Sequence, residues 1–242
     1  LNILGCYSAA PRKNANPTSQ VLEIRNHLFL IDCGEGTQVQ LRLSKIKFSR
    51  IKHIFISHLH GDHFFGLVGL ISTFKLLTRE TDLHIYGPKG LKEIISLQMK
   101  LSESWTNYKL IFHELSSKSP ECIFEDDKVE VHTIPLKHRI YTNGFLFKEK
   151  THPRKLNMTA IAEAKIDFSY FKKLQQGIDV FNDDGKLIKN QAVTFKGKKS
   201  LSYAFCSDTM YDETIIPMIT DVDVLYHEST FLEKHAKLAI LT

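Results

Sequence analysis

Short apolar segments bounded by turn residues dominate the first third of the sequence. Three of them predict strands, at residues 1–4, 20–24 and 27–31. Arg25 and Asn26 separate the last two segments as the turn of a β-hairpin would. The chain is therefore expected to begin as a sheet.

Apolar residues at helical spacing follow, and strands then alternate with helices. We expect helices at 36–46, 64–77 and 91–101, and strands at 53–57, 83–86, 128–135, 144–148, 202–206 and 222–226. The Gly-Pro-Lys-Gly run at 87–90 marks a turn. This alternation predicts an α/β fold with mixed sheets.

The segment 149–199 has a different character, with few contiguous apolar residues and a turn at 182–185. We interpret it as an inserted, basic and flexible arm that projects from the core. Between 148 and 199 there are 12 Lys and Arg against six Asp and Glu, an excess of +6, whereas the remaining 20 bases and 21 acids leave −1. Positive charge gathered in one segment favours contact with a polyanion, although a solvated loop would have the same composition.

Length and composition restrict the class of protein. The 242 residues, 43% of them hydrophobic, are enough for a substantial core in one large domain or two small ones. No apolar run approaches the ~20 residues that span a bilayer, and residues 1–10 do not resemble a signal peptide, so we expect a cytoplasmic protein without membrane contact. The four cysteines stand far apart without a CxxC pair, which favours buried thiols over disulfides or a zinc finger.

Candidate metal ligands are concentrated directly after the strand expected at 53–57. Within SHLHGDH, His58, His60, Asp62 and His63 place three imidazoles and one carboxylate within six residues. Nitrogen and oxygen donors of this kind suit borderline cations such as zinc, and a catalytic site leaves one position open for water. Four close ligands would crowd one tetrahedral ion, so we expect two ions to share them.

Two later residues follow apolar strands and are candidates to complete the site. His138 comes after the strand at 128–135, and Asp208 comes after the strand at 202–206. Each of them alone would be a helix cap or a satisfied polar residue more often than a ligand. The cluster at 58–63 makes the ligand interpretation the favoured one.

Motifs along nearly the whole chain then point to a family. They are IDCGEGT at 31–37, SHLHGDHFFGL at 57–67, YGPKG at 86–90, the isolated His138, CSDT at 206–209 and HESTF at 227–231. Together they resemble ribonuclease Z, the tRNA 3′ processing endonuclease of the metallo-β-lactamase superfamily. The HxHxDH pattern indicates only the superfamily, whereas GDHFFGL, YGPKG and HESTF are specific to this branch.

The resemblance implies a fold and a two-metal site. The fold is a four-layer αββα metallo-β-lactamase sandwich, with the metals at one edge of the stacked sheets and the arm at 149–199 protruding to bind tRNA. Two Zn²⁺ ions per chain are implied, with Mn²⁺ or another divalent ion as alternatives. One ion is held by His58, His60 and His138 and the other by Asp62 and His63, while Asp208 bridges the two ions.

The resemblance also implies roles for other residues. Asp62 orients or deprotonates the attacking water, and Glu228 supports a motif histidine that protonates the leaving 3′-oxygen. Asp32 orients a ligand histidine through a hydrogen bond. Lys172 and Lys173 in the arm contact tRNA phosphates without reading sequence. A homodimer is implied as well.

The sequence departs from the family near its end. Ribonuclease Z proteins carry a further ligand histidine after a late strand and a His-Ser-Thr motif between HESTF and that strand, and neither stands here. Residues 238–242 resemble the strand that leads into the missing histidine. We therefore expect that about one helix with its loop, and the end of the chain, are omitted from the sequence rather than from the protein.

Three hypotheses for function result. The first is a zinc-dependent endoribonuclease that hydrolyses precursor tRNA at its 3′ side, removes the trailer and leaves a 3′-hydroxyl. The second is a phosphodiesterase of the same fold that acts on small nucleotides, and the third is a catalytically silent RNA-binding relative. The basic arm favours the first over the second, and the set of metal ligands favours the first over the third.

Overall fold

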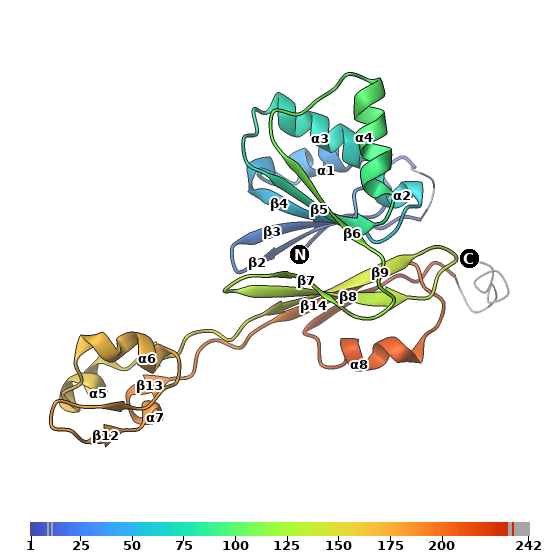
Figure 1. Ribbon diagram of the computed structural model, residues 1–242. Coiled ribbons are helices and arrows are strands. Elements are labelled where there is room, and N and C mark those ends of the chain that lie inside the picture. Colours follow the sequence, from blue (N-terminus) through green and yellow to red (C-terminus); the bar gives the residue numbers. More distant parts are fainter. Residues whose placement is uncertain (9, 11, 232–233, 235–242) are drawn as a thin grey trace. The chain divides into compact units, whose positions relative to one another are not determined.

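The computed structural model describes residues 1–8, 10, 12–231 and 234. The chain divides into two compact units (Figure 1). The first unit comprises the chain up to residue 147 and from residue 202 onward, and the second comprises residues 148–201.

The first sheet of the first unit has the strand order β1-β2-β3-β4-β5-β6. Its strands are β1 (Asn2–Gly5), β2 (Ser19–Ile24), β3 (His27–Ile31), β4 (Ile51–Phe55), β5 (Leu83–Pro88) and β6 (Leu110–Leu115). Strands β3 to β6 run parallel, and β2 pairs antiparallel with both β1 and β3. The predicted hairpin is present, and Arg25 and Asn26 both have positive φ, as the mirror-type turns that suit the strand twist require.

The second sheet has the strand order β15-β14-β9-β8-β7. Its strands are β7 (Cys122–Glu125), β8 (Val129–Leu136), β9 (Thr142–Glu149), β14 (Ser202–Cys206) and β15 (Val224–His227). Strands β14 and β15 run parallel. Both their carboxyl ends therefore lie at the same edge of the sheet.

Helices cover the outer faces of the two sheets, which gives a helix–sheet–sheet–helix arrangement (Figure 1). The first sheet is covered by α1 (Thr37–Leu43), α3 (Leu67–Leu76) and α4 (Leu91–Leu101), and the second by the short η3 (Glu213–Ile215) and α8 (Ile216–Ile219). Between the sheets lies an aromatic core that includes Phe29, Phe55, Phe145, Phe147 and Phe205, all fully buried. Burial of each such ring contributes about 1.5–3 kcal/mol to folding.

The sequence did not predict β6 and β7, and it placed one helix boundary wrongly. The helix expected at 64–77 is divided into α2 (Gly61–Phe64) and α3. The division lies near Gly66, where a Cβ atom would lie 2.1 Å from the carbonyl oxygen of Gly34. Asp62 and His63 consequently lie in a short helical turn and not in a loop.

The second unit has a small core of its own, formed by Ile161, Ile166, Leu174, Val180 and Val193. Its helices are α5 (Met158–Glu163), η2 (Phe168–Tyr170), α6 (Phe171–Gln175) and α7 (Asn190–Val193). Its strands pair as β10 (Lys155–Leu156) with β13 (Thr194–Phe195) and β11 (Val180–Phe181) with β12 (Leu187–Ile188). The segment interpreted as an inserted arm is thus packed around apolar residues that its sequence pattern did not reveal.

Two further observations complete the fold. The strand expected at 238–242 lies outside the described residues. Among the described residues, no helix is both long and apolar enough to cross a membrane. The remaining short helix of the first unit is η1 (Phe48–Arg50), which leads into β4.

Candidate metal centre

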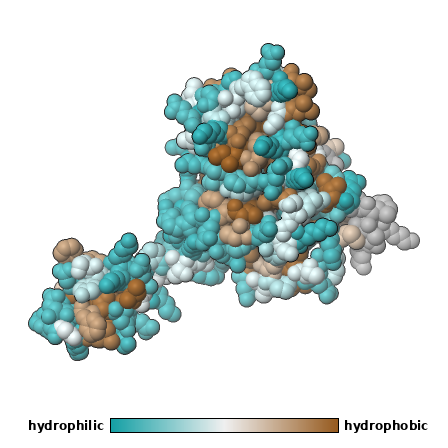
Figure 2. Space-filling view, viewed as in Figure 1, coloured by the Kyte–Doolittle hydropathy of each residue, from teal (hydrophilic) through white to brown (hydrophobic). Residues whose placement is uncertain are grey.

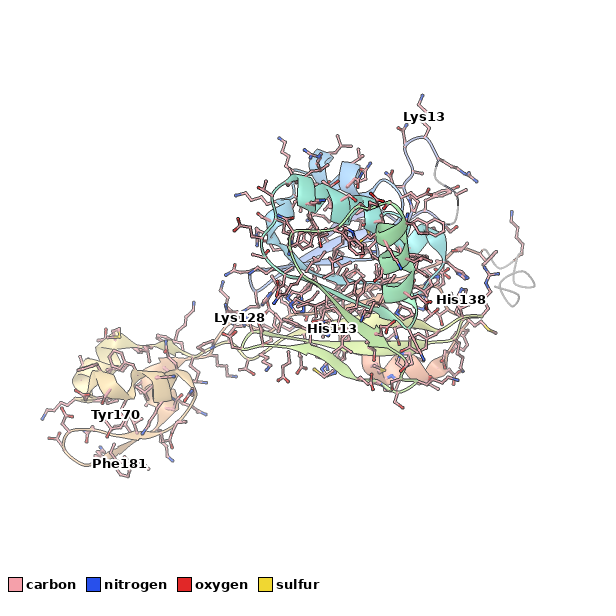
Figure 3. The ribbon with its side chains drawn as sticks, turned by 45° about the horizontal axis from the view of Figure 1, so that its top comes forward. Lys13, His113, Lys128, His138, Tyr170 and Phe181 are labelled. Carbon is pink, nitrogen blue, oxygen red and sulfur yellow. The ribbon has the colours of Figure 1, made fainter. Side chains whose placement is uncertain are left out.

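Loops and helix starts from both sheets bring the predicted ligands to one edge of the first unit. His58 and His60 follow β4, and His63 lies in α2. His138 lies between β8 and β9, at the end of the second sheet where Figure 3 labels it, and Asp208 follows β14. Parallel strands β4 and β14 end at this edge, which is why residues far apart in the sequence meet there.

Three imidazole nitrogens converge in the first ligand group. Nδ1 of His60 lies 3.0 Å from Nε2 of His58 and 3.2 Å from Nε2 of His138. With one carboxylate oxygen of Asp208, the ligand atoms of these residues all lie within 4.8 Å of one another. This spacing allows a single ion to contact all four side chains.

A second ligand group adjoins the first. Nε2 of His63 lies 3.6 Å from Oδ2 of Asp62 and 3.6 Å from Oδ1 of Asp208. The other carboxylate oxygen of Asp208, Oδ2, lies 3.8 Å from Nε2 of His58. Asp208 therefore presents one oxygen to each group, as a carboxylate shared by two ions would.

Asp32 is buried beneath the second group, at the end of β3. Its carboxylate accepts hydrogen bonds from the Ser57 backbone N–H at 2.8 Å and from the Ser57 hydroxyl at 2.9 Å. Its Oδ2 also lies 2.7 Å from Nδ1 of His63. Asp32 has a φ of 54°, an unusual conformation for a residue with a side chain, and these contacts hold it there.

The two ligand loops of the second sheet are joined to each other. The Lys137 N–H donates to the Thr209 hydroxyl at 3.2 Å, and the Met210 N–H donates to the Lys137 carbonyl at 2.7 Å. The Ser207 hydroxyl donates to the Ser57 hydroxyl at 3.2 Å, which connects the two sheets beside the site. These bonds fix His138 relative to Asp208.

Glu228 lies just after β15 at the same sheet edge. Its backbone N–H donates to the Cys206 carbonyl at 3.1 Å, and its carboxylate accepts from the Thr230 N–H at 3.0 Å. The charge of Glu228 is one of the causes that raise the pKa of Asp208. Glu228 is therefore held close to the metal pocket.

Electrostatics keep the histidines of the first group neutral. Burial, followed by the neighbouring imidazoles, lowers the pKa of His58. Burial and then the charges of His60 and Arg139 lower the pKa of His138 to about 4, and burial also lowers the pKa of His60. Because only the neutral imidazole binds a metal, these side chains are ready to accept an ion.

The second group carries negative charge that a cation would neutralise. Burial, and then the carboxylates of Glu228, Asp62 and Asp32, raise the pKa of Asp208 to about 6. Burial alone would lower the pKa of His63, but Asp32, Asp208 and Asp62 outweigh burial and raise it to about 9. Three carboxylates around one imidazole fit a divalent ion, and so does the donor set of the first group.

The structure adds residues that the sequence did not single out and places others apart. Ser57, Ser207, Thr209 and Arg139 contact or support the ligands, and their signal was only adjacency to the motifs. Lys172 and Lys173 are exposed on α6 in the second unit, which Figure 3 marks by Tyr170 and Phe181. They are not among the residues around the metal pocket.

Comparison with known proteins identifies the family. Ribonuclease Z of Bacteroides thetaiotaomicron is 47% identical over 233 residues, which are 96% of this chain and 74% of that protein. Ribonuclease Z of Cytophaga hutchinsonii is also 47% identical, over 100% of this chain and 77% of that protein. The chain belongs to the ribonuclease Z family. Residues 1–191 also belong to the family whose model is described as Anti-Pycsar protein Apyc1, a match that ends before Asp208.

Solved structures agree on the fold of this ribonuclease Z. The short form of human tRNase Z superposes with a TM-score of 0.71 at 25% identity, over 99% of this chain and 82% of that one. The metallo-β-lactamase fold protein YhfI of Bacillus subtilis superposes with a TM-score of 0.60 at 15% identity, over 96% of this chain and 72% of that one. The predicted αββα metallo-β-lactamase sandwich is confirmed.

Proposed function

We propose that this ribonuclease Z is an endoribonuclease that hydrolyses precursor tRNA at the 3′ side of the mature sequence and leaves a 3′-hydroxyl. The observation that carries the proposal is the pair of adjoining ligand groups that share Asp208, in a chain whose relatives are named ribonuclease Z. A two-metal centre suits the in-line displacement at a phosphodiester.

The donor sets assign two zinc ions to the pocket. His58, His60 and His138 would hold one ion, Asp62 and His63 the other, and Asp208 both. Bound there, the ions would act as Lewis acids that generate the nucleophile near neutral pH and stabilise charge on the reacting phosphate. Asp32 orients His63 and keeps Nε2 of that ring turned toward the pocket.

Two carboxylates of the chain are placed to handle protons. Asp62 lies in the pocket beside His63, where it would orient the attacking water and accept its proton. Glu228 lies at the opposite sheet, fixed by Thr230 and by the backbone of Cys206. It would support proton delivery to the leaving 3′-oxygen.

The second unit would bind the body of the tRNA as a protruding arm. Lys165 and Lys189 are paired with Asp184 and Asp179, so part of their charge is compensated. Lys172 and Lys173 are exposed, and the ion pairs of the described residues include neither of them. We assign these two lysines to phosphate contacts.

One experiment tests the proposed reaction. The full-length protein is incubated with a labelled precursor tRNA and with bis(p-nitrophenyl) phosphate, each with and without a chelator. We expect cleavage of both, loss of both on chelation, and a tRNA product that RNA ligase can extend through its 3′-hydroxyl. Cleavage of the diester alone would support the small-nucleotide phosphodiesterase instead, and binding without cleavage would support the silent relative.

We also infer a homodimer. Leu43, Leu76 and Leu101 lie at the carboxyl ends of α1, α3 and α4 with 69%, 81% and 76% of their surface exposed. These helices each connect parallel strands, so their ends share one side of the helical layer, and Figure 2 shows apolar residues exposed on that layer. Light scattering should give twice the chain mass, and Leu76→Glu with Leu101→Glu should reduce it to one. A cytoplasmic location stays a prediction.

A further inference from the structure

Arg139 lies beside the metal pocket without a carboxylate partner. It follows His138 directly, is exposed, and its Nε lies 3.2 Å from Nε2 of His60. None of the ion pairs found among the described residues includes Arg139, although Asp62 and Asp208 are at the same site. An arginine with five donors and no anion next to a reaction centre is available for an anionic ligand.

The contact between Arg139 and His60 depends on which ring nitrogen carries the proton. Nδ1 of His60 is the atom that faces His58 and His138, so it is the atom that would contact an ion. A neutral imidazole that binds through Nδ1 keeps its proton on Nε2. Nε2 is then a donor and cannot accept a hydrogen bond from Arg139. The Arg139–His60 bond is therefore compatible with the metal-free site only.

The same reasoning gives the guanidinium a partner when the site is filled. Released from His60, Arg139 would present a planar fork of N–H donors beside the pocket, and this fork matches the geometry of phosphate oxygens. We propose that Arg139 binds a non-bridging oxygen of the phosphate that is cleaved. The proposal rests on the phosphodiester hydrolysis proposed above, and it makes Arg139 a substrate-binding residue instead of a support for His60.

The test measures binding of a product that cannot be cleaved again. A 3′-labelled trailer oligonucleotide is prepared with and without a 5′-phosphate, the group that the cleaved bond leaves on it. Its affinity for the zinc-loaded, full-length protein is measured by fluorescence anisotropy for the wild type, Arg139→Gln and Arg139→Lys. Zinc per chain is measured on the same samples.

We expect the wild type to prefer the phosphorylated oligonucleotide, and Arg139→Gln to reduce that preference by about tenfold, the effect of one charged hydrogen bond. Binding of the unphosphorylated oligonucleotide and the zinc content should be unchanged. Arg139→Lys keeps the charge but loses the fork, so it should recover only part of the preference.

Lys137→Gln is the matched control, because Lys137 lies two residues away and its charge is already paired with Asp212 at 3.0 Å. It should keep the full preference for the 5′-phosphate. Equal losses in the Lys137 and Arg139 variants would show a general charge effect and overturn the proposal. A loss of zinc in Arg139→Gln would instead make Arg139 a support for His60, and an unchanged preference would also overturn the proposal. Cleavage of precursor tRNA by the wild type tests the proposed function separately.

Discussion

Oδ2 of Asp32 lies 2.7 Å from Nδ1 of His63, and the same carboxylate binds Ser57 through its backbone and its hydroxyl. The carboxylate thereby fixes the plane of the His63 ring and leaves Nε2 as the nitrogen that faces Asp62 and Asp208. A residue that contacts no ion in this arrangement therefore controls the second ligand group.

We predict that Asp32→Asn weakens the second metal about 10–100-fold, the usual cost of losing such a supporting contact. Asparagine tolerates the positive φ at this position, but its amide cannot accept from both Ser57 and His63. Zinc per chain, measured after dialysis against graded chelator, should fall from two to one at a concentration that leaves the wild type full.

Asp126→Asn is a matched control for that experiment. Asp126 forms a histidine–carboxylate pair of the same length, 2.7 Å, with His27, a residue of β3 outside the ligand groups. Its substitution should leave both zinc ions bound. Retention of two ions by Asp32→Asn under the same conditions would contradict the role of Asp32.

We predict that Asp208→Ala loses both metals and all activity. Its two oxygens face different ligand groups, at 3.8 Å from His58 and 3.6 Å from His63, so one substitution removes a ligand from each ion. Zinc analysis and cleavage of bis(p-nitrophenyl) phosphate measure the two effects. Asp212→Asn, in the same loop, should keep both metals, and a single remaining ion in Asp208→Ala would show that the carboxylate does not bridge.

The sequence predicted most of the fold because the strands of the first unit are continuous apolar segments and its helices are amphipathic. It failed where that signal is weak. Strand β6 contains His113 and Glu114 between apolar residues, and β7 is four residues long. The core of the second unit escaped prediction because its five buried residues are scattered over 33 positions of a lysine-rich segment.

The candidate site was predicted further than the fold, because metal ligands are rare residue types at characteristic spacings. What the sequence could not give is the set of contacts between segments. Ser57 joins Asp32 to Ser207, and Lys137 joins the loops of His138 and Asp208, through hydroxyl and backbone groups that any polar loop could carry. Such bonds become visible only when the two sheet edges are brought together.

We predict that Lys172→Glu with Lys173→Glu raises the KM for precursor tRNA by about tenfold and leaves hydrolysis of the small diester unchanged. Both lysines are exposed on α6, in the second unit, where they can contact phosphate without touching the metal centre. The dependence of tRNA affinity on salt should become less steep by about one to two in its logarithmic slope.

The control for the arm is Lys47→Glu with Lys52→Glu, which changes the net charge by the same amount. These exposed lysines stand at the amino-terminal end of β4, and His58 follows its other end. They should leave both substrates unaffected. Equal losses on tRNA and the diester in the Lys172 and Lys173 variant would refute a binding role for the arm.

We predict that His53 makes the folded protein sensitive to acid. Its ring on β4 stacks on His84 at 5.0 Å and meets Phe124 at 4.6 Å between centroids. Burial, and then the charges of His84, His27 and His113, lower its pKa from 6.5 to about 3. Between these values the unfolded chain binds the proton and the folded chain does not, so this contribution to stability is complete above about pH 6.5 and decreases as the pH falls toward 3. His53→Gln should therefore lose less stability than the wild type between pH 7.5 and pH 5.

Urea unfolding of the metal-free protein at both pH values measures this difference, and a chelator removes the effect of metal release. The ligand histidines titrate alike in the wild type and the variant, so the change in the free energy of unfolding between the two pH values isolates His53. His152→Gln, in the second unit, serves as the control and should follow the wild type. An equal loss of stability in His53→Gln and the wild type would mean that the ring is protonated in the fold without cost, which its burial against Phe124 and three other histidines argues against.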